Sequence, residues 1–65
     1  SYDYWVTKAY ILLGDVYFKQ KDYFNAKATF QSIVDNTLNT ELKNEAQAKL
    51  SKVVDEESES SKVGN

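Results

Sequence analysis

Apolar residues recur at helical spacing in three consecutive blocks of the chain, and short polar segments separate these blocks. The first block predicts a helix from about Asp3 to Gln20, with Asp3 or Ser1 as its N-cap. A surface helix usually has one apolar stripe, but the apolar residues of this block cover more than one face. We therefore expect this helix to pack against neighbours on two sides. The apolar residues are Trp5, Val6, Ala9, Tyr10, Ile11, Leu12, Leu13, Val16, Tyr17 and Phe18.

The second block predicts a helix from Tyr23 to about Asn36, after a short polar break that ends in the N-cap residue Asp22. Two helices joined by so short a loop must lie antiparallel. The third block predicts an amphipathic helix over about 41–57, with Thr40 as the expected N-cap. Each of these blocks has one inward stripe, made of Tyr23, Ala26, Phe30, Ile33 and Val34 in the second and Leu42, Ala46, Leu50, Val53 and Val54 in the third.

These three blocks predict an all-α fold, in which a helix–turn–helix unit is followed by a C-terminal amphipathic helix. There is no Pro, Gly occurs only at Gly14 and Gly64, and the sequence has no β-hairpin turn signal. The last residues are mostly acidic or serine, and such a segment cannot offset the entropy lost on ordering. We expect one helical domain over 1–57 and a disordered tail over 58–65.

The composition argues against catalysis, bound metals and nucleic-acid binding. The chain has no His and no Cys, which excludes zinc sites of the Cys/His type and leaves Asp, Glu, Lys or Tyr for general base chemistry. Asp15 and Lys19 lie four residues apart on one helix, a spacing that usually gives a surface ion pair. The net charge is −2, whereas a nucleic-acid surface would be basic. We expect no enzyme activity and no cofactor.

Neither a membrane span nor a calcium site is predicted. The longest apolar stretch, Val6–Phe18, contains two charged residues and is shorter than the roughly 20 residues that a membrane-spanning helix needs. Glu56, Glu57 and Glu59 provide carboxylates, but they do not follow the spacing of an EF-hand loop. A solvated acidic segment is the simpler interpretation.

One spaced set of residues resembles a known repeat. The pattern Tyr-x2-Leu-Gly-x2-Tyr followed by Ala-x3-Phe is similar to the tetratricopeptide repeat, a helix–turn–helix unit of about 34 residues. The resemblance covers about 7–40, roughly half of the chain, although the proline usual near the repeat end is replaced by Leu38. An unrelated helical hairpin with a small-residue crossing is the alternative. The matching residues are Tyr10, Leu13, Gly14, Tyr17, Ala26 and Phe30.

The resemblance implies a particular packing of the first two helices. Gly14 lies inside a predicted helix, where glycine costs about 1 kcal/mol relative to alanine, so a packing reason is expected. In the family the matching glycine allows the two helices to approach closely and faces the matching alanine, here Ala26. Leu13, Tyr17 and Phe30 would fill the space between the helices. Because repeats need neighbours to bury a continuous core, we expect the C-terminal end of a longer array or association of two chains.

The resemblance also implies a role. Family members bind proteins or peptides in a groove lined by the first helix of each repeat, and the matching candidates are Lys8, Ile11, Leu12, Asp15, Phe18 and Lys19. Some members clamp a C-terminal carboxylate with asparagines, where this chain has Ile11 and Asp15, so that function is not expected. Alternatively, Ile11, Leu12 and Phe18 face an upstream repeat. The prediction is a non-catalytic scaffold for a protein or peptide; the alternatives are a structural cap without a ligand and a homodimer formed through exposed aromatic residues such as Tyr2, Tyr4 and Trp5.

Overall fold

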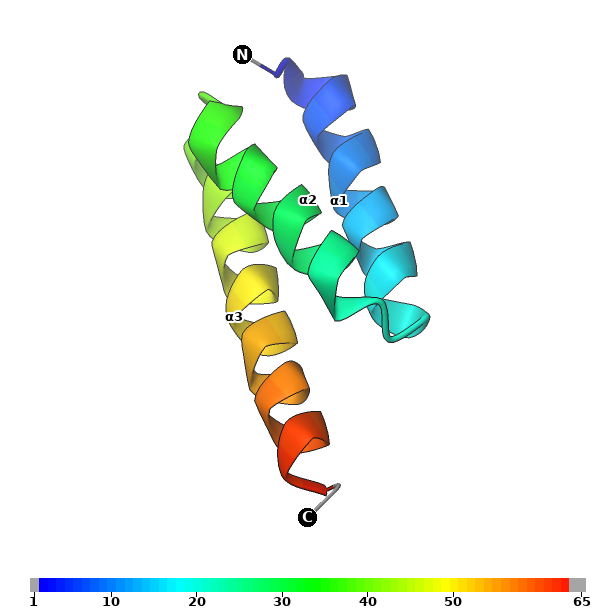
Figure 1. The fold of residues 1–65 in the computed structure, drawn as a ribbon. Coiled ribbons are helices and arrows are strands. Elements are labelled where there is room, and N and C mark those ends of the chain that lie inside the picture. Colours follow the sequence, from blue (N-terminus) through cyan, green and yellow to red (C-terminus); the bar gives the residue numbers. More distant parts are fainter. Residues whose placement is uncertain (1, 64–65) are drawn as a thin grey trace.

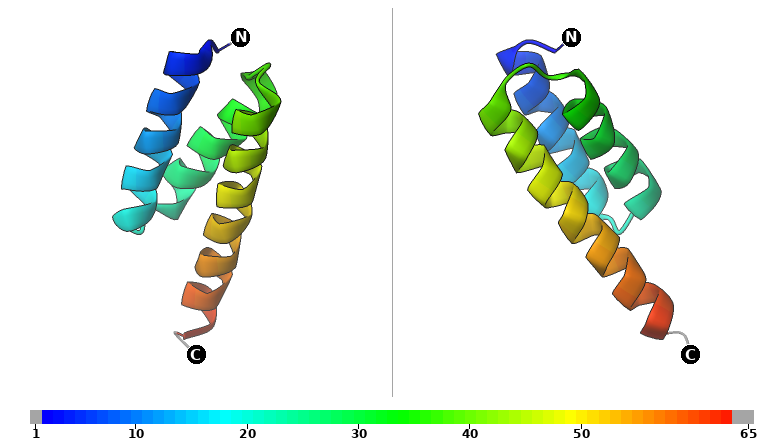
Figure 2. Two further views of the ribbon diagram at one scale, coloured as in Figure 1. Left: turned by 180° about the vertical axis from the view of Figure 1, so that it is seen from behind. Right: turned by 90° about the vertical axis from the view of Figure 1, so that its left-hand side faces the viewer.

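The fold consists of three helices, α1 (Tyr4–Lys19), α2 (Tyr23–Asn36) and α3 (Thr40–Val63), in a computed structural model that describes residues 2–63 (Figure 1). The predicted all-α fold is confirmed. The helices α1 and α3 run in the same direction, and α2 runs in the opposite direction and packs against both (Figure 2). The C-terminal turns of α3 project beyond the other two helices (Figure 1), which makes the molecule elongated, at 42 × 17 × 13 Å.

Side-chain caps set the start of each helix. The Asp3 carboxylate accepts a hydrogen bond from the Val6 N–H at 2.8 Å, and Asp22 does the same for α2. Both caps were predicted. The prediction for α3 was wrong, because Thr40 is the first helical residue and Asn39 is the cap. The Asn39 side-chain oxygen accepts from the Leu42 N–H at 2.9 Å, and asparagine caps a helix at least as well as threonine.

The turn between α1 and α2 requires a left-handed backbone conformation at Lys21, where φ is 62°. The Lys21 N–H donates to the Phe18 carbonyl and the Asp22 N–H donates to the Tyr17 carbonyl, both at 2.9 Å. This pair of bonds is the Schellman motif, whose left-handed residue is usually glycine. The tight turn brings the chain back directly into α2.

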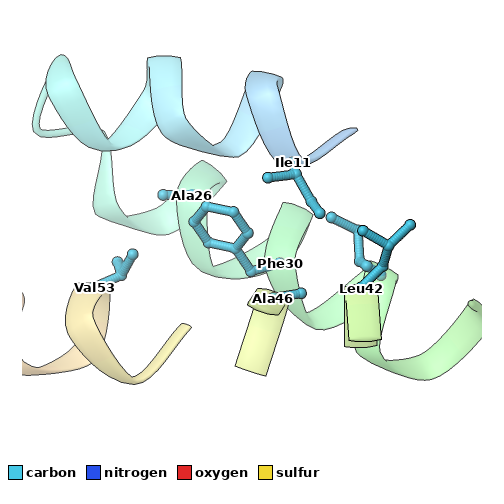
Figure 3. Close-up of a cluster of buried hydrophobic side chains, with 7 residues drawn as sticks. Ile11, Ala26, Phe30, Leu42, Ala46 and Val53 are labelled. Atoms are coloured by element: carbon cyan, nitrogen blue, oxygen red, sulfur yellow. The ribbon is translucent and has the colours of Figure 1, made fainter. Parts of the chain in front are cut away.

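The core lies where the three helices meet. Figure 3 shows its side chains converging from all three helices, with the ring of Phe30 among them. Phe30 is only 1% exposed and is among the largest of the fully buried side chains. The core residues are Ile11, Ala26, Phe30, Ile33, Leu42, Ala46 and Val53.

Gly14 accommodates an aromatic ring rather than the small residue expected from the resemblance. A Cβ atom at Gly14 would lie 2.5 Å from Cε1 and 2.6 Å from Cζ of Phe30, well inside contact distance. The three atoms nearest to that position all belong to Phe30, so the ring of Phe30 sets the limit on the approach at Gly14. Ala26 is fully buried, which follows from its place on the inward face of α2 one turn before Phe30.

The beginning of the chain is joined to the end of α2 and to Thr37, the residue that follows it. The Tyr2 N–H donates to the Asn36 carbonyl at 3.3 Å, and the Tyr2 and Ser32 hydroxyl oxygens are 2.8 Å apart. The buried hydroxyls of Thr7 and Thr37 are hydrogen-bonded to each other at 3.3 Å. These contacts hold the start of α1 against the end of α2.

The expected disordered tail is wrong for residues 58–63, which continue α3 to Val63. Residues 64–65 of that prediction lie outside the described residues. Each residue added to an existing helix gains a backbone hydrogen bond without a new nucleation cost, and 41–63 contains neither Gly nor Pro. An ion pair of 2.6 Å between Lys27 of α2 and Glu57 ties α3 to α2 just before this segment.

Candidate functional site

A groove of about 630 Å³ lies between α1 and α3. Four residues predicted for a groove on the first helix line it, namely Leu12, Asp15, Phe18 and Lys19. They share one side of α1 because spacings of three, four and seven residues return to the same side of a helix. The remaining lining residues are Val16 and Lys49.

An ion pair connects the two helices at this groove. The Lys49 ammonium lies 3.0 Å from Asp15 Oδ1 and 3.3 Å from Asp15 Oδ2. Both side chains are about one-third exposed, so solvent weakens their attraction. The sequence suggested Lys19 as the partner of Asp15, but within the described residues Asp15 pairs with Lys49 and Lys19 remains exposed. Lys49 was missed because the two residues are 34 positions apart.

The groove has an apolar lining with a basic edge. Leu12 is 65% exposed and Val16 is 49% exposed, so both present apolar surface to a ligand of the groove. Phe18 is half-buried and packs against the core and against Tyr23, with 6.2 Å between the ring centroids. Since Lys49 neutralises Asp15, the positive charge of Lys19 remains at the edge. An apolar side chain with acidic neighbours would complement this surface.

Two of the predicted groove residues lie elsewhere. Ile11 is only 3% exposed and belongs to the core, because it shares the inward face of α1 with Thr7 and Gly14. Lys8 is half-buried and does not line the groove. Ile11, which stands where some family members have a clamp asparagine, is therefore a core residue.

The motif residues fall into two groups. Gly14, Ala26 and Phe30 are buried together between α1 and α2, as a packing motif requires. Leu13 is 39% exposed, so it fills the space between the helices less completely than expected, and the motif residue Tyr10 is 38% exposed. Tyr10 stacks on Tyr2, with ring centroids 4.9 Å apart. The remaining motif residue, Tyr17, is half-buried against the core.

Two further hollows on the surface are smaller than the groove. One, of about 400 Å³, lies between α2 and α3 and is lined by Phe24, Lys27, Ala28, Gln31, Leu50 and Val54. The other, of about 310 Å³, is lined by Lys21, Tyr23, Glu56, Glu59 and Ser60. Among residues 2–63, no group of His, Cys, Asp and Glu side chains is placed to hold a metal ion. In the same part of the chain, no helix combines the length and apolar character needed to cross a membrane.

Taken together, the fold and the groove define a small three-helix protein with an open, apolar surface and a basic edge. Comparison of the chain with protein-family models, with curated proteins and with solved structures found no match.

Proposed function

We propose that the chain is a non-catalytic protein-interaction module of the tetratricopeptide type, which holds a segment of another protein in the groove between α1 and α3. The observation that carries the proposal is the groove itself, where large apolar side chains stay exposed beside a basic edge. The spacing of Gly14, Ala26 and Phe30 supports the repeat assignment, because these residues are buried together. A rigid helical surface of this kind recognises its partner without chemistry of its own.

The ligand is an acidic segment that carries a large apolar side chain. Burial of that side chain against Leu12 and Val16 supplies most of the affinity, since apolar contact dominates small protein interfaces. Acidic neighbours are attracted to Lys19, which increases the association rate more than the affinity. Because the groove is open and short, we expect binding in the micromolar range or weaker, and the attraction to decrease as salt is added.

The test is an NMR titration of the protein with a capped peptide in which one leucine or phenylalanine is flanked by glutamates. We expect amide shifts concentrated at Leu12, Val16 and Lys19, and weaker or no shifts with a peptide in which lysines replace the glutamates. Leu12→Ser should weaken binding about tenfold, because burial of a leucine contributes about 1.5–3 kcal/mol. Leu38→Ser is the matched control, since Leu38 is 85% exposed in the loop before α3.

Equal loss of binding in the two variants would contradict the proposal, as would shifts scattered over all three helices. Equal binding of the glutamate-flanked and lysine-flanked peptides would show that Lys19 does not attract the ligand. The alternative function, a structural or self-association element, is favoured by a second surface that shares Leu12 and Val16 with the groove. That surface is the outer side of α1, where apolar side chains remain exposed away from the core.

A further inference from the structure

The outer side of α1 has a wide, uncharged, exposed surface. It lies opposite the buried residues Ile11 and Gly14, because successive residues turn by about 100° around a helix. Trp5 at 76% is the most exposed of its large side chains. We call this surface the outer face; its members are Trp5, Val6, Ala9, Leu12, Leu13 and Val16. A contiguous apolar surface of this kind usually marks an interaction site.

The charged residues of α1 are confined to one edge of the outer face. Lys8, Asp15 and Lys19 are the only charged residues of this helix, and their spacing of seven and four residues places them along one line. The opposite edge carries Tyr10 and Tyr17. The outer face is therefore bordered by a charged edge on one side and by an aromatic edge on the other.

We propose that a second copy of this chain covers the outer face, with the two α1 helices antiparallel around a two-fold axis. When the helices overlap fully, Tyr4 of one copy lies opposite Lys19 of the other. Lys8 lies four residues after Tyr4, and Asp15 lies four residues before Lys19. Full overlap thus sets Lys8 opposite Asp15 of the second copy, and the two-fold axis repeats this pair.

Charge complementarity selects the antiparallel arrangement. In an antiparallel pair each edge faces the same edge of the other copy, so lysine meets aspartate. In a parallel pair the charged edge would face the edge formed by Tyr10 and Tyr17, and no charges would pair. Asp15 can serve both Lys8 of the second copy and its own Lys49, because a carboxylate accepts several hydrogen bonds and this one is about one-third exposed.

The size of the contact indicates a reversible dimer. The 16 residues of α1 form a seam about 24 Å long, which places the buried area at the lower end of the range for specific interfaces. Leu12 and Val16 belong to both the outer face and the groove. A second copy and a groove-bound peptide therefore compete, although the dimer itself does not depend on any ligand of the groove.

Sedimentation equilibrium of the whole chain over a wide concentration range tests the proposal. We expect a monomer–dimer equilibrium that Lys8→Glu weakens roughly tenfold, because two attractive pairs become repulsive at once. Lys43→Glu is the matched control, with the same change of charge at an exposed position of α3. A chain that stays monomeric at all concentrations, or equal effects of the two variants, would overturn the proposal.

A mixing experiment tests the register directly. The double variant Asp15→Lys/Lys49→Asp keeps an ion pair between α1 and α3 but should associate as poorly as Lys8→Glu. An equimolar mixture of these two variants should form heterodimers, because both interchain pairs are then attractive. Failure to recover association in the mixture, with both variants helical by circular dichroism, would refute the antiparallel register.

One further variant separates the dimer from the proposed groove function. Ala9 lies within the outer face but does not line the groove. Ala9→Lys should therefore give a monomer that still binds the acidic peptide. A fully dimeric Ala9→Lys variant would contradict the dimer alone, whereas a monomer that binds no peptide would contradict only the groove assignment.

Discussion

Replacing Gly14 with alanine tests the close contact between α1 and the ring of Phe30. The new Cβ atom would lie 2.5 Å from Cε1 of the ring, where ordinary contact begins near 3.4 Å. The ring cannot move away freely because Phe30 is 1% exposed and surrounded by the core. Either α1 shifts outward or the core repacks around a displaced ring.

Two opposing effects set the size of the change in stability. Alanine gains about 1 kcal/mol over glycine inside a helix. Forcing an extra methyl group into a well-packed core costs about 1–3 kcal/mol. We expect the variant to be less stable by about 1 kcal/mol, and Gly14→Leu to lose more because its side chain is larger.

A double-mutant cycle with Phe30→Leu isolates the contact. Leucine lacks the Cε1 and Cζ atoms, which are the two closest to the added Cβ. Only the contact with Cδ1, at 3.0 Å, has a counterpart in leucine. In the Phe30→Leu background, Gly14→Ala should therefore stabilise the protein by up to about 1 kcal/mol, because the helix propensity of alanine then outweighs the weaker remaining contact. The sign of the alanine effect should reverse, with a coupling energy of about 2 kcal/mol between the two sites.

Urea unfolding followed by far-UV circular dichroism measures all four proteins of the cycle. The free energies of unfolding are compared only where the dependence on urea concentration, the m-value, is the same, because a changed m-value indicates a change in the denatured state. If Gly14→Ala stabilises the original chain as much as it does the Phe30→Leu variant, the ring does not limit the approach of the two helices. The packing described above would then be wrong.

Two further changes test local features of the fold. Lys21→Gly should stabilise the protein by about 0.5–1 kcal/mol in urea unfolding, because Lys21 has a left-handed conformation that glycine adopts without strain; a loss of stability would mean that this turn has another backbone conformation. Asn39→Ala should cost about 1 kcal/mol by loss of the cap of α3, while Thr40→Ala changes little. A larger loss of stability in Thr40→Ala than in Asn39→Ala would mean that Thr40, and not Asn39, caps α3.

Local sequence signals were sufficient to predict the elements of this fold. The helical spacing of apolar residues predicted three helices, and Asp3 and Asp22 were recognised as caps because a cap acts through hydrogen bonds within its own first turn. The end of α3 was not recognised. Composition alone favoured disorder there, whereas a helix already nucleated upstream extends at little cost.

Contacts between distant residues required the tertiary structure. The resemblance singled out Gly14 as a packing position, but its partner is a ring on another helix, and the choice between Ala26 and Phe30 depends on how the two helices are rotated. The ion pair between Asp15 and Lys49 likewise joins residues 34 positions apart. Periodicity determines which face of a helix is apolar, but only the packing of all three helices decides which of these apolar side chains are buried. The neighbouring residues Ile11, which is buried, and Leu12, which is exposed, demonstrate this.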